Sequence, residues 1–148
     1  MPLLKIDDNK FEVEKGKTVL EVALENDIEI PHYCYHPALE IAGSCRMCLV
    51  QVEGMPKLQV SCNTFISEVP SDRKVDGKYD MVVNTQNELV TQERKNILEF
   101  LLLNHPLDCP VCDQAGECYL QDYSFKFGNA HSRFDEDKRV RPNENLGS

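Results

Sequence analysis

The sequence lacks any apolar stretch that approaches the roughly 20 residues needed to cross a bilayer. Its longest apolar run, ILEFLLL at 97–103, is interrupted by Glu99. The N-terminus, MPLLKIDDNKFEV, has neither a basic leader nor an apolar run of signal-peptide length. We therefore expect a cytoplasmic protein in a reducing environment, with no membrane span of its own and any membrane association made through partner proteins.

Positive charge is also scarce. The chain has 16 Lys and Arg residues against 25 Asp and Glu residues, which gives a formal net charge of -9. It contains no basic stripe with interleaved aromatic residues, no internal repeat of solenoid length and no low-complexity tract. Because negative charge repels phosphate backbones, we expect no nucleic acid partner. The 148 residues have room for one ordinary domain or two small ones.

Cysteine, by contrast, is abundant, with seven residues in the chain. An odd number of cysteines cannot pair completely within one chain, and disulfides are rare in a reducing compartment. The apolar fraction of 41% provides a modest core rather than a large one. We therefore interpret the cysteines first as metal ligands, which could also contribute to holding the fold together.

The first 83 residues are predicted to form one small α+β domain. Two strands, 3–6 and 10–14, flank a turn and form a hairpin. Thr18 and Glu21 have the spacing of a capping box and predict a helix over 19–26. The segment CLVQVEGMPKLQVSC, 48–62, predicts two strands around a turn at 54–56, and YDMVV predicts a last strand at 79–83. Residues 31–48 show no apolar period and are expected to form a loop.

A second, mostly helical region is predicted after residue 83. Thr85 and Glu88 repeat the capping-box spacing, and the helix that they begin is expected to end near Leu103. A largely apolar set is expected to fall mostly on one side of this helix, namely Leu89, Val90, Glu93, Ile97, Phe100 and Leu101. The segment ECYLQDYSFKF predicts a short helix, and the polar tail is expected to need a partner to order it. The expected domains are 1–83, 84–128 and the tail 129–148.

Four of the cysteines stand before or inside the predicted strands 48–62, namely Cys34, Cys45, Cys48 and Cys62. A single cysteine, a close pair and a distant fourth follow the order of the ligands in a plant-type [2Fe-2S] site. The spacing differs, because the first two cysteines are separated by ten residues in this chain and by four in the plant-type site. The extra length contains Pro37 and Gly43 and is expected to loop out. The alternative is a structural zinc site with four thiolates, which usually has two close pairs where this set has one.

The residues around this first set suggest how it is arranged. A tight turn at Gly43 and Ser44 would point backbone amides at sulfur atoms and stabilise negative charge there. His32 and His36 flank Cys34. Because four thiols are already available, we expect both histidines to be packing or surface residues rather than ligands.

A second set of possible ligands follows the long helix and comprises His105, Cys109, Cys112 and Cys118. No cysteine downstream completes an all-cysteine set. Three interpretations are open: His105 is the fourth ligand of an iron site, the four residues bind structural zinc, or His105 only interacts with the last helix carbonyls. The ferredoxin-like first set favours a second cluster, because two redox centres in one chain form a relay.

Two segments, HYCYHPALEIAGSCRMCLVQVEG (32–54) and LLLNHPLDCPVCDQAGECYLQDYSFKFG (101–128), closely resemble the N-terminal part of the large iron-sulfur subunits of respiratory complex I. The likeness extends to SRFDEDKR at 132–139. It implies a β-grasp, ferredoxin-like domain whose [2Fe-2S] cluster is held by Cys34, Cys45, Cys48 and Cys62. It also implies a small [4Fe-4S] domain whose cluster is held by His105, Cys109, Cys112 and Cys118.

In that family, electrons leave NADH through a flavin on a partner subunit and pass along iron-sulfur clusters toward quinone. The resemblance therefore implies an electron-transfer subunit of an NADH:quinone oxidoreductase, with no substrate-converting active site of its own. It implies flavin- and iron-sulfur-containing partner subunits and a peripheral place on the cytoplasmic face of the inner membrane.

The chain also departs from the family pattern. Family members continue into a further four-cysteine [4Fe-4S] segment and a molybdopterin-enzyme-like region, whereas this sequence ends at RPNENLGS. We therefore expect a short or split subunit, or a fragment. Diaphorase subunits of soluble hydrogenases and formate dehydrogenases carry similar modules, so the parent complex stays open. A free ferredoxin-like carrier and a zinc-stabilised interaction module are alternatives from other classes.

Overall fold

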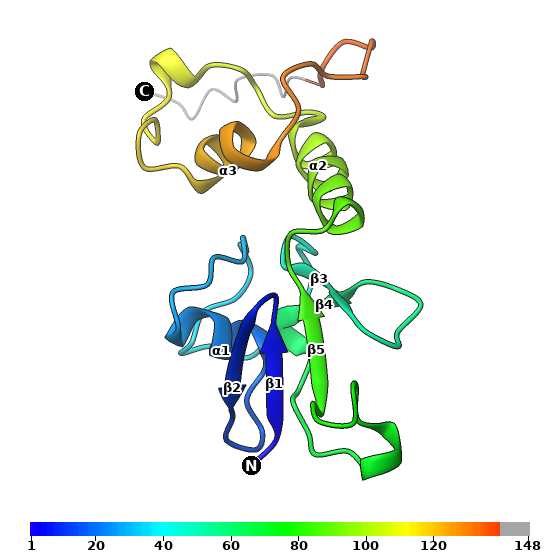
Figure 1. The fold of residues 1–148 in the computed structure, drawn as a ribbon. Coiled ribbons are helices and arrows are strands. Elements are labelled where there is room, and N and C mark those ends of the chain that lie inside the picture. The colour runs from blue at the N-terminus through cyan, green and yellow to red at the C-terminus, as the bar shows by residue number, and fades with distance from the viewer. Residues whose placement is uncertain (140–148) are drawn as a thin grey trace. The chain divides into compact units, whose positions relative to one another are not determined.

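The structure, a computed structural model, describes residues 1–139 and divides into two compact units, Met1–Arg94 and Lys95–Ser148. The division falls inside helix α2 (Glu88–Leu102), which Figure 1 shows leading away from strand β5. The first unit combines a sheet with one short helix, and the second consists of helical segments and loops. The predicted α+β class is thus confirmed. In the described part of the chain, no helix is long and apolar enough to span a membrane.

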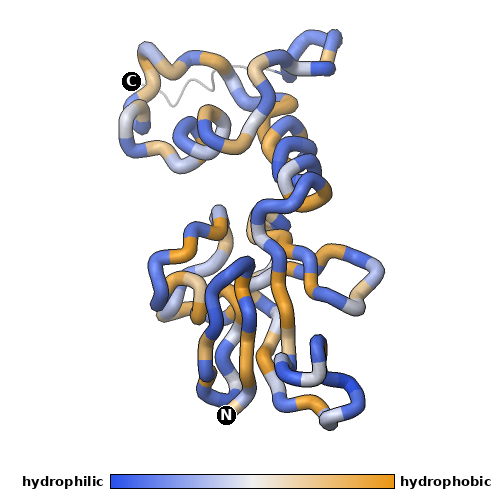
Figure 2. The backbone as a smooth tube through the Cα atoms, viewed as in Figure 1, coloured by the Kyte–Doolittle hydropathy of each residue, from blue (hydrophilic) through white to orange (hydrophobic). Residues whose placement is uncertain are grey.

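The first unit is built on a mixed five-stranded sheet in the order β2-β1-β5-β3-β4. Strands β1 and β5 are parallel, and the other neighbours are antiparallel. The strands are short: β1 Leu3–Ile6, β2 Asn9–Glu12, β3 Leu49–Val52, β4 Gln59–Val60 and β5 Met81–Asn84. The first hairpin, the second hairpin and the last strand are confirmed. Figure 2 shows a run of apolar residues along β5.

Helix α1 (Val19–Glu25) begins with the predicted capping box. The Thr18 hydroxyl accepts the Glu21 amide at 3.3 Å, and the Glu21 carboxylate accepts the Thr18 amide at 2.7 Å. A helix of this length is not stable alone, so its buried side must be held by packing. That side consists of Val19, Leu20, Val22 and Ala23.

The core of the first unit lies between the sheet and α1. Leu4, Ile6, Val50 and Val83 from the strands are fully buried with Leu20 from the helix. The same cluster includes two cysteine side chains, those of Cys48 and Cys62. Two of the candidate metal ligands therefore belong to the hydrophobic core itself.

The predicted cap of α2 is wrong. The helix begins at Glu88, and the Asn87 side chain, not that of Thr85, accepts the Val90 amide at 2.9 Å. Thr85 instead donates its amide and hydroxyl to the Asp7 carboxylate at 2.7 and 2.6 Å. A charged acceptor makes the stronger hydrogen bond, so the hydroxyl is used in a contact with the residue after β1 rather than as a helix cap.

The predicted apolar side of α2 is also wrong in part. Leu89 and Phe100 are 50% and 75% exposed, whereas the buried residues are Val90, Arg94 and Leu98. These three are spaced by four residues and therefore lie along one side of the helix. An apolar pattern in the sequence does not reveal the burial of Arg94, because charged side chains are rarely buried unless they are paired.

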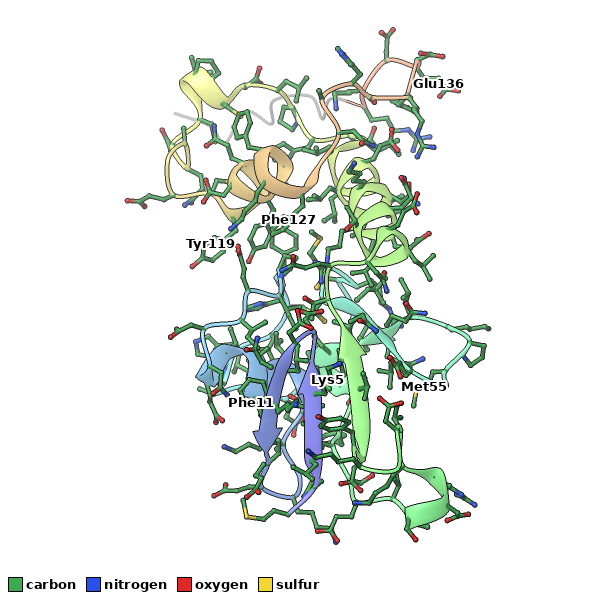
Figure 3. All side chains as sticks on the ribbon, viewed as in Figure 1. Lys5, Phe11, Met55, Tyr119, Phe127 and Glu136 are labelled. Carbon is green, nitrogen blue, oxygen red and sulfur yellow. The ribbon has the colours of Figure 1, made fainter. Side chains whose placement is uncertain are left out.

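In the second unit, α3 (Tyr119–Phe127) matches the predicted short helix. Its aromatic residues at intervals of four contact one another: the Tyr119 and Tyr123 rings stack at 6.0 Å between centroids, and Tyr123 meets Phe127 edge-on at 5.7 Å. Figure 3 labels the two ends of this row, Tyr119 and Phe127. The row lies on one side of α3, as i, i+4 side chains do.

The start of the predicted tail is attached to the second half of α2. The Arg133 guanidinium forms an ion pair with the Glu99 carboxylate, and the Arg139 amide donates to the Asn104 side chain at 3.1 Å. Lys138 donates to the carbonyls of Leu102 and Leu103 at 2.6 and 3.3 Å. The chain itself thus orders this part of the predicted tail. Residues 140–148 of that tail lie outside the described residues.

Asp80, just before β5, joins three segments of the first unit. Its carboxylate accepts the amides of Leu3 and Val69 at 2.8 and 2.9 Å and lies 3.3 Å from the Lys74 ammonium. Burial raises the pKa of Asp80, but these hydrogen bonds and the nearby ammonium outweigh burial and lower it below the usual value. A depressed folded-state pKa stabilises the fold above the unfolded-state pKa, and this stability is lost as the pH falls through the folded-state value.

We predict that Asp80→Asn lowers the free energy of unfolding at pH 7 by about 1–3 kcal/mol, because an amide cannot accept all three donors. The deficit relative to wild type should narrow as the pH falls below about 3.9, where the unfolded carboxyl is protonated. Urea unfolding followed by circular dichroism measures both effects. Asp72→Asn, at an exposed carboxylate of the same segment, is the control, and equal losses in the two variants would contradict the assignment.

Candidate metal centres

The β3-β4 hairpin brings the first two thiols together. Cys48 directly precedes β3, and Cys62 lies in a 3-10 turn, Ser61–Asn63, directly after β4. The register pairs Leu49 with Val60, and the Ser61 amide donates to the Cys48 carbonyl at 3.0 Å. Adjacent strand ends therefore place both cysteines at one edge of the core, where each is only 1% exposed.

The other two thiols reach the same place from the irregular loop 31–48. The Cys45 amide donates to the Cys34 sulfur at 3.5 Å. Gly43 and Arg46 both have left-handed φ angles, +59° and +60°, which turn the chain tightly on either side of Cys45. The expected turn is present, and an amide next to it points at a sulfur atom.

The other three thiols of this set all act on the ionisation of Cys62. Burial raises the pKa of Cys62 to about 12, and Cys48, Cys34 and Cys45 act in the same direction. For Cys34, burial also opposes ionisation, but hydrogen bonds from Cys45 and Ser44 outweigh it and lower the pKa to about 7. Burial therefore dominates at Cys62, whereas hydrogen bonding dominates at Cys34.

One buried hydroxyl beside this set has unused hydrogen-bonding capacity. Ser61 is fully buried, and no atom of residues 1–139 forms a hydrogen bond with its Oγ. Buried polar groups without a partner are costly, and an unplaced ligand is one recognised explanation for them. A thiol set with a spare hydroxyl donor fits an iron-sulfur group, whose sulfur atoms accept hydrogen bonds.

The neighbouring histidines are engaged locally. The Nδ1 atom of His32 lies 2.8 Å from the Ile30 carbonyl, and that of His36 accepts the Ala38 amide at 3.2 Å. His32 also packs edge-on against Tyr35. These contacts agree with the expected packing and surface roles.

The second set lies on turns between α2 and α3. The His105 amide continues the helix by donating to the Leu102 carbonyl at 3.2 Å, and Cys109 begins a 3-10 turn, Cys109–Val111. The Cys112 amide closes that turn on the Cys109 carbonyl at 3.3 Å. Gly116 has φ +87°, and Cys118 is the N-cap residue of α3. Local turns thus return the chain from His105 to Cys118.

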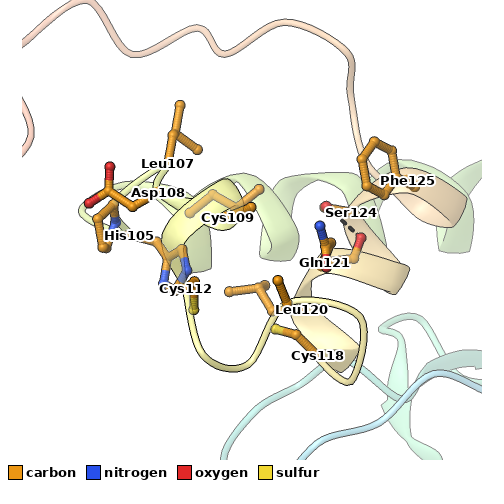
Figure 4. Close-up of a pocket in the computed structure, with 13 residues that line it drawn as sticks. His105, Leu107, Asp108, Cys109, Cys112, Cys118, Leu120, Gln121, Ser124 and Phe125 are labelled. Atoms are coloured by element: carbon orange, nitrogen blue, oxygen red, sulfur yellow. Dashed lines mark hydrogen bonds between the residues drawn. The ribbon is translucent and has the colours of Figure 1, made fainter.

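All four candidate ligands of the second set line one cavity of about 300 Å³ (Figure 4). Leu102, Leu120 and Phe125 contribute apolar walls. One water occupies about 30 Å³ of liquid, so the cavity has room for a group of several atoms. Three thiols and an imidazole around such a space fit an iron-sulfur cluster in donor chemistry.

The side chain of His105 lies at the cavity and not at the helix end. The carbonyls of Leu102 and Leu103, at the end of α2, accept hydrogen bonds from the Lys138 ammonium. The cation expected at a helix C-terminus is therefore Lys138 and not His105. The His105 side chain lines the cavity instead. Sequence reasoning missed Lys138 because it lies far along the chain in a polar segment with almost no apolar residues.

The two sets of candidate ligands differ in their exposure to solvent. Cys48 and Cys62 are buried, whereas Cys112 and His105 are exposed and Cys109 is partly exposed. All seven cysteines are free thiols. Among residues 1–139, no three His, Cys, Asp or Glu side chains lie close enough together to hold a single metal ion.

Two protein families match separate parts of the chain. Residues 3–69 match the family described as "2Fe-2S iron-sulfur cluster binding domain". Residues 94–133 match the [4Fe-4S] family described as "NADH-ubiquinone oxidoreductase-G iron-sulfur binding region". The first match contains all four residues of the first set, and the second contains all four of the second set. The predicted cofactors, one [2Fe-2S] and one [4Fe-4S] cluster, are confirmed at the level of these families.

Curated relatives match almost the whole chain. The G subunit of NADH-quinone oxidoreductase from Rickettsia felis is 44% identical over 144 residues, which is 97% of this chain and 20% of the relative. The NADH-ubiquinone oxidoreductase 75 kDa subunit of Reclinomonas americana is 45% identical over 142 residues, 96% of this chain and 19% of the relative. This chain therefore spans about a fifth of the length of these relatives.

A solved structure shares the fold. A chain in the crystal structure of an NAD+-reducing [NiFe]-hydrogenase in the H2-reduced state superposes with a TM-score of 0.78 at 30% identity. The match covers 95% of this chain and 55% of that one. Together with the higher identity of the curated relatives and the two family matches, this shows that the chain is similar to the N-terminal part of NADH-quinone oxidoreductase G subunits.

Proposed function

We propose that this chain is an iron-sulfur electron-transfer subunit, or part of one, in a complex I-like NADH dehydrogenase. It relays single electrons from a flavin-containing, NADH-oxidising partner toward quinone. The observation that carries the proposal is that one short chain gathers two separate sets of soft metal donors, four thiols at a sheet edge and three thiols with an imidazole around a cavity. Its relatives are subunits of NADH-quinone oxidoreductases.

The ligand assignment is part of this proposal. Cys34, Cys45, Cys48 and Cys62 hold the [2Fe-2S] cluster in a β-grasp domain over 1–83. His105, Cys109, Cys112 and Cys118 hold the [4Fe-4S] cluster in a second domain over 84–128, followed by the polar tail. Soft thiolates are the donors that iron-sulfur clusters prefer, and an imidazole can replace one of them.

When bound, an iron-sulfur cluster accepts and gives up one electron at a time. The protein needs no nucleophile, general base or substrate pocket for this role. The buried positions of Cys48 and Cys62 exclude water from one side of the first site. The Cys45 amide stabilises negative charge on the Cys34 sulfur. At the second site, a neutral imidazole in place of a thiolate removes one negative charge.

The parent complex has two candidates. The higher identity to the G subunit from Rickettsia felis, 44% against 30%, favours an NADH-quinone oxidoreductase on the cytoplasmic face of the membrane, with flavin- and iron-sulfur-containing partner subunits. The fold match favours, as a second candidate, a diaphorase-type subunit of a soluble hydrogenase. Affinity purification from the native host distinguishes the two, because quinone-reducing membrane subunits accompany the chain in the first case and a nickel-containing subunit in the second.

Metal analysis tests the assignment directly. We predict about six irons and six acid-labile sulfides per chain, the sum of one [2Fe-2S] and one [4Fe-4S] cluster. Cys62→Ser should lower the iron content to about four, and Cys109→Ser to about two, because each removes a ligand of one cluster only. His36→Ala, at an exposed histidine beside Cys34, is the control that should keep both clusters. Zinc without sulfide in the wild-type chain would instead establish the interaction-module alternative.

The role of His105 is tested by its replacement with cysteine. We predict that His105→Cys lowers the midpoint potential of the [4Fe-4S] cluster, because a thiolate adds negative charge where the imidazole was neutral. Redox titration followed by electron paramagnetic resonance measures this potential, with the [2Fe-2S] signal as an internal control. An unchanged [4Fe-4S] midpoint would show that His105 does not bind iron.

Removal of iron and sulfide should affect the two sites unequally. We predict a large rise in amide hydrogen exchange over 105–118, where only local turns hold the backbone, and a smaller rise over 48–62, where the hairpin and core persist. Mass spectrometry of the iron-depleted and intact chains measures the difference. Full protection of 105–118 without iron would mean that this loop does not depend on its cluster.

A further inference from the structure

A buried positive charge lies next to the first thiol set. Arg94, on α2, is only 4% exposed, and its Nη2 atom donates to the Leu49 carbonyl at 3.1 Å. Leu49 immediately follows Cys48 and begins β3. The guanidinium therefore binds the backbone at the first residue of β3, directly after the proposed ligand Cys48.

The groups that act on this charge are Cys48, Asp7 and Glu29. Burial lowers the pKa of Arg94 to about 10, and the three neighbours oppose that effect, Cys48 foremost. Arg94 thus keeps its charge at neutral pH. The Asp7 carboxylate also accepts two hydrogen bonds from Thr85, so its negative charge is shared with another partner.

A fixed positive charge favours whichever state of a neighbouring group is more negative. Reduction of an iron-sulfur cluster adds one negative charge, and the effect of a nearby cation is larger in a buried site because screening by water is weak. Charge and hydrogen bonding around the sulfur ligands are among the factors that set cluster potentials. A cation beside Cys48 therefore raises the potential of a cluster bound through that thiolate.

We propose that Arg94 is a positioning residue of the [2Fe-2S] site, which raises the reduction potential of the cluster by holding a buried positive charge beside Cys48 while its guanidinium fixes the backbone at Leu49. This inference rests on the proposed function, since it requires Cys48 to bind the cluster. It also gives a role to Arg94 as the charged residue among the three buried residues of α2, Val90, Arg94 and Leu98. The proposed metal ligands do not explain why this charge is buried.

Three variants of the full chain with both clusters test the proposal. Arg94→Gln keeps hydrogen-bond donors but removes the charge, Arg94→Lys keeps the charge, and Lys95→Gln removes a charge from the next position of the same helix, about 100° around its axis. The readout is the midpoint potential of each cluster in redox titrations followed by electron paramagnetic resonance. A merely structural arginine would not shift this potential.

For Arg94→Gln we expect the oxidised-to-reduced ratio of the [2Fe-2S] cluster at a fixed potential to rise about tenfold, equivalent to a midpoint about 59 mV lower for one electron. Arg94→Lys and Lys95→Gln should stay close to wild type, and the [4Fe-4S] midpoint should not move. An unchanged [2Fe-2S] midpoint in Arg94→Gln, or an equal shift in Lys95→Gln, would overturn the proposal.

Two further results keep the test decisive. If Arg94→Gln fails to assemble the [2Fe-2S] cluster, a normal cluster and midpoint in Arg94→Lys supports a role for the charge, and loss of the cluster in both variants overturns it. The proposed function fails separately, through a wild-type chain without a [2Fe-2S] signal or a Cys48→Ser variant that keeps it. An Arg94 result alone leaves the cluster assignment untouched.

Discussion

Two thiols are buried inside the hydrophobic core of the first unit, so the core and the candidate [2Fe-2S] site depend on the same packing. Cys48 and Cys62 stand at adjacent ends of the β3-β4 hairpin and pack with Val50 and Leu20 in the same cluster that holds the sheet to α1. The fold and the candidate [2Fe-2S] site therefore share residues. Packing that positions the hairpin also positions two of the proposed ligands, which limits how far either thiol can move.

Strands of two to four residues provide few ladder hydrogen bonds, and charged side chains add further connections between distant segments of the chain. Asp80 joins β1 to the segment before β5, Asp7 joins the end of β1 to Thr85, and Arg94 joins α2 to β3. Each connection lies between residues far apart in the sequence and is made by a charge-assisted hydrogen bond, which is stronger than a neutral one. One of these charges also lies beside Cys48, so the same guanidinium serves the fold and, as we propose, the potential of the cluster.

The two candidate sites represent different solutions to metal binding. The first is built into a core and has two ligands that solvent barely reaches, whereas the second surrounds an open cavity with ligands on turns. At the second site, Lys138 donates to the carbonyl at the end of α2, and the His105 side chain lines the cavity. A site on turns gains most of its order from the group that it binds, since few buried contacts hold its backbone.

The ligand types and their spacing, both hairpins, the capping box of α1 and the short helix α3 could all be predicted from the sequence, because each depends on residues close together in the chain. Features that depend on distant residues emerge only in the folded chain. Thr85 has the spacing of a helix cap, but the charge of Asp7 draws its hydroxyl away, and Asn87 caps α2 instead. Arg94 has the character of a surface residue, yet its place between Val90 and Leu98 buries it against the Leu49 carbonyl. Local pattern cannot reveal either outcome, because the competing partner lies in another part of the chain and only folding brings the two together.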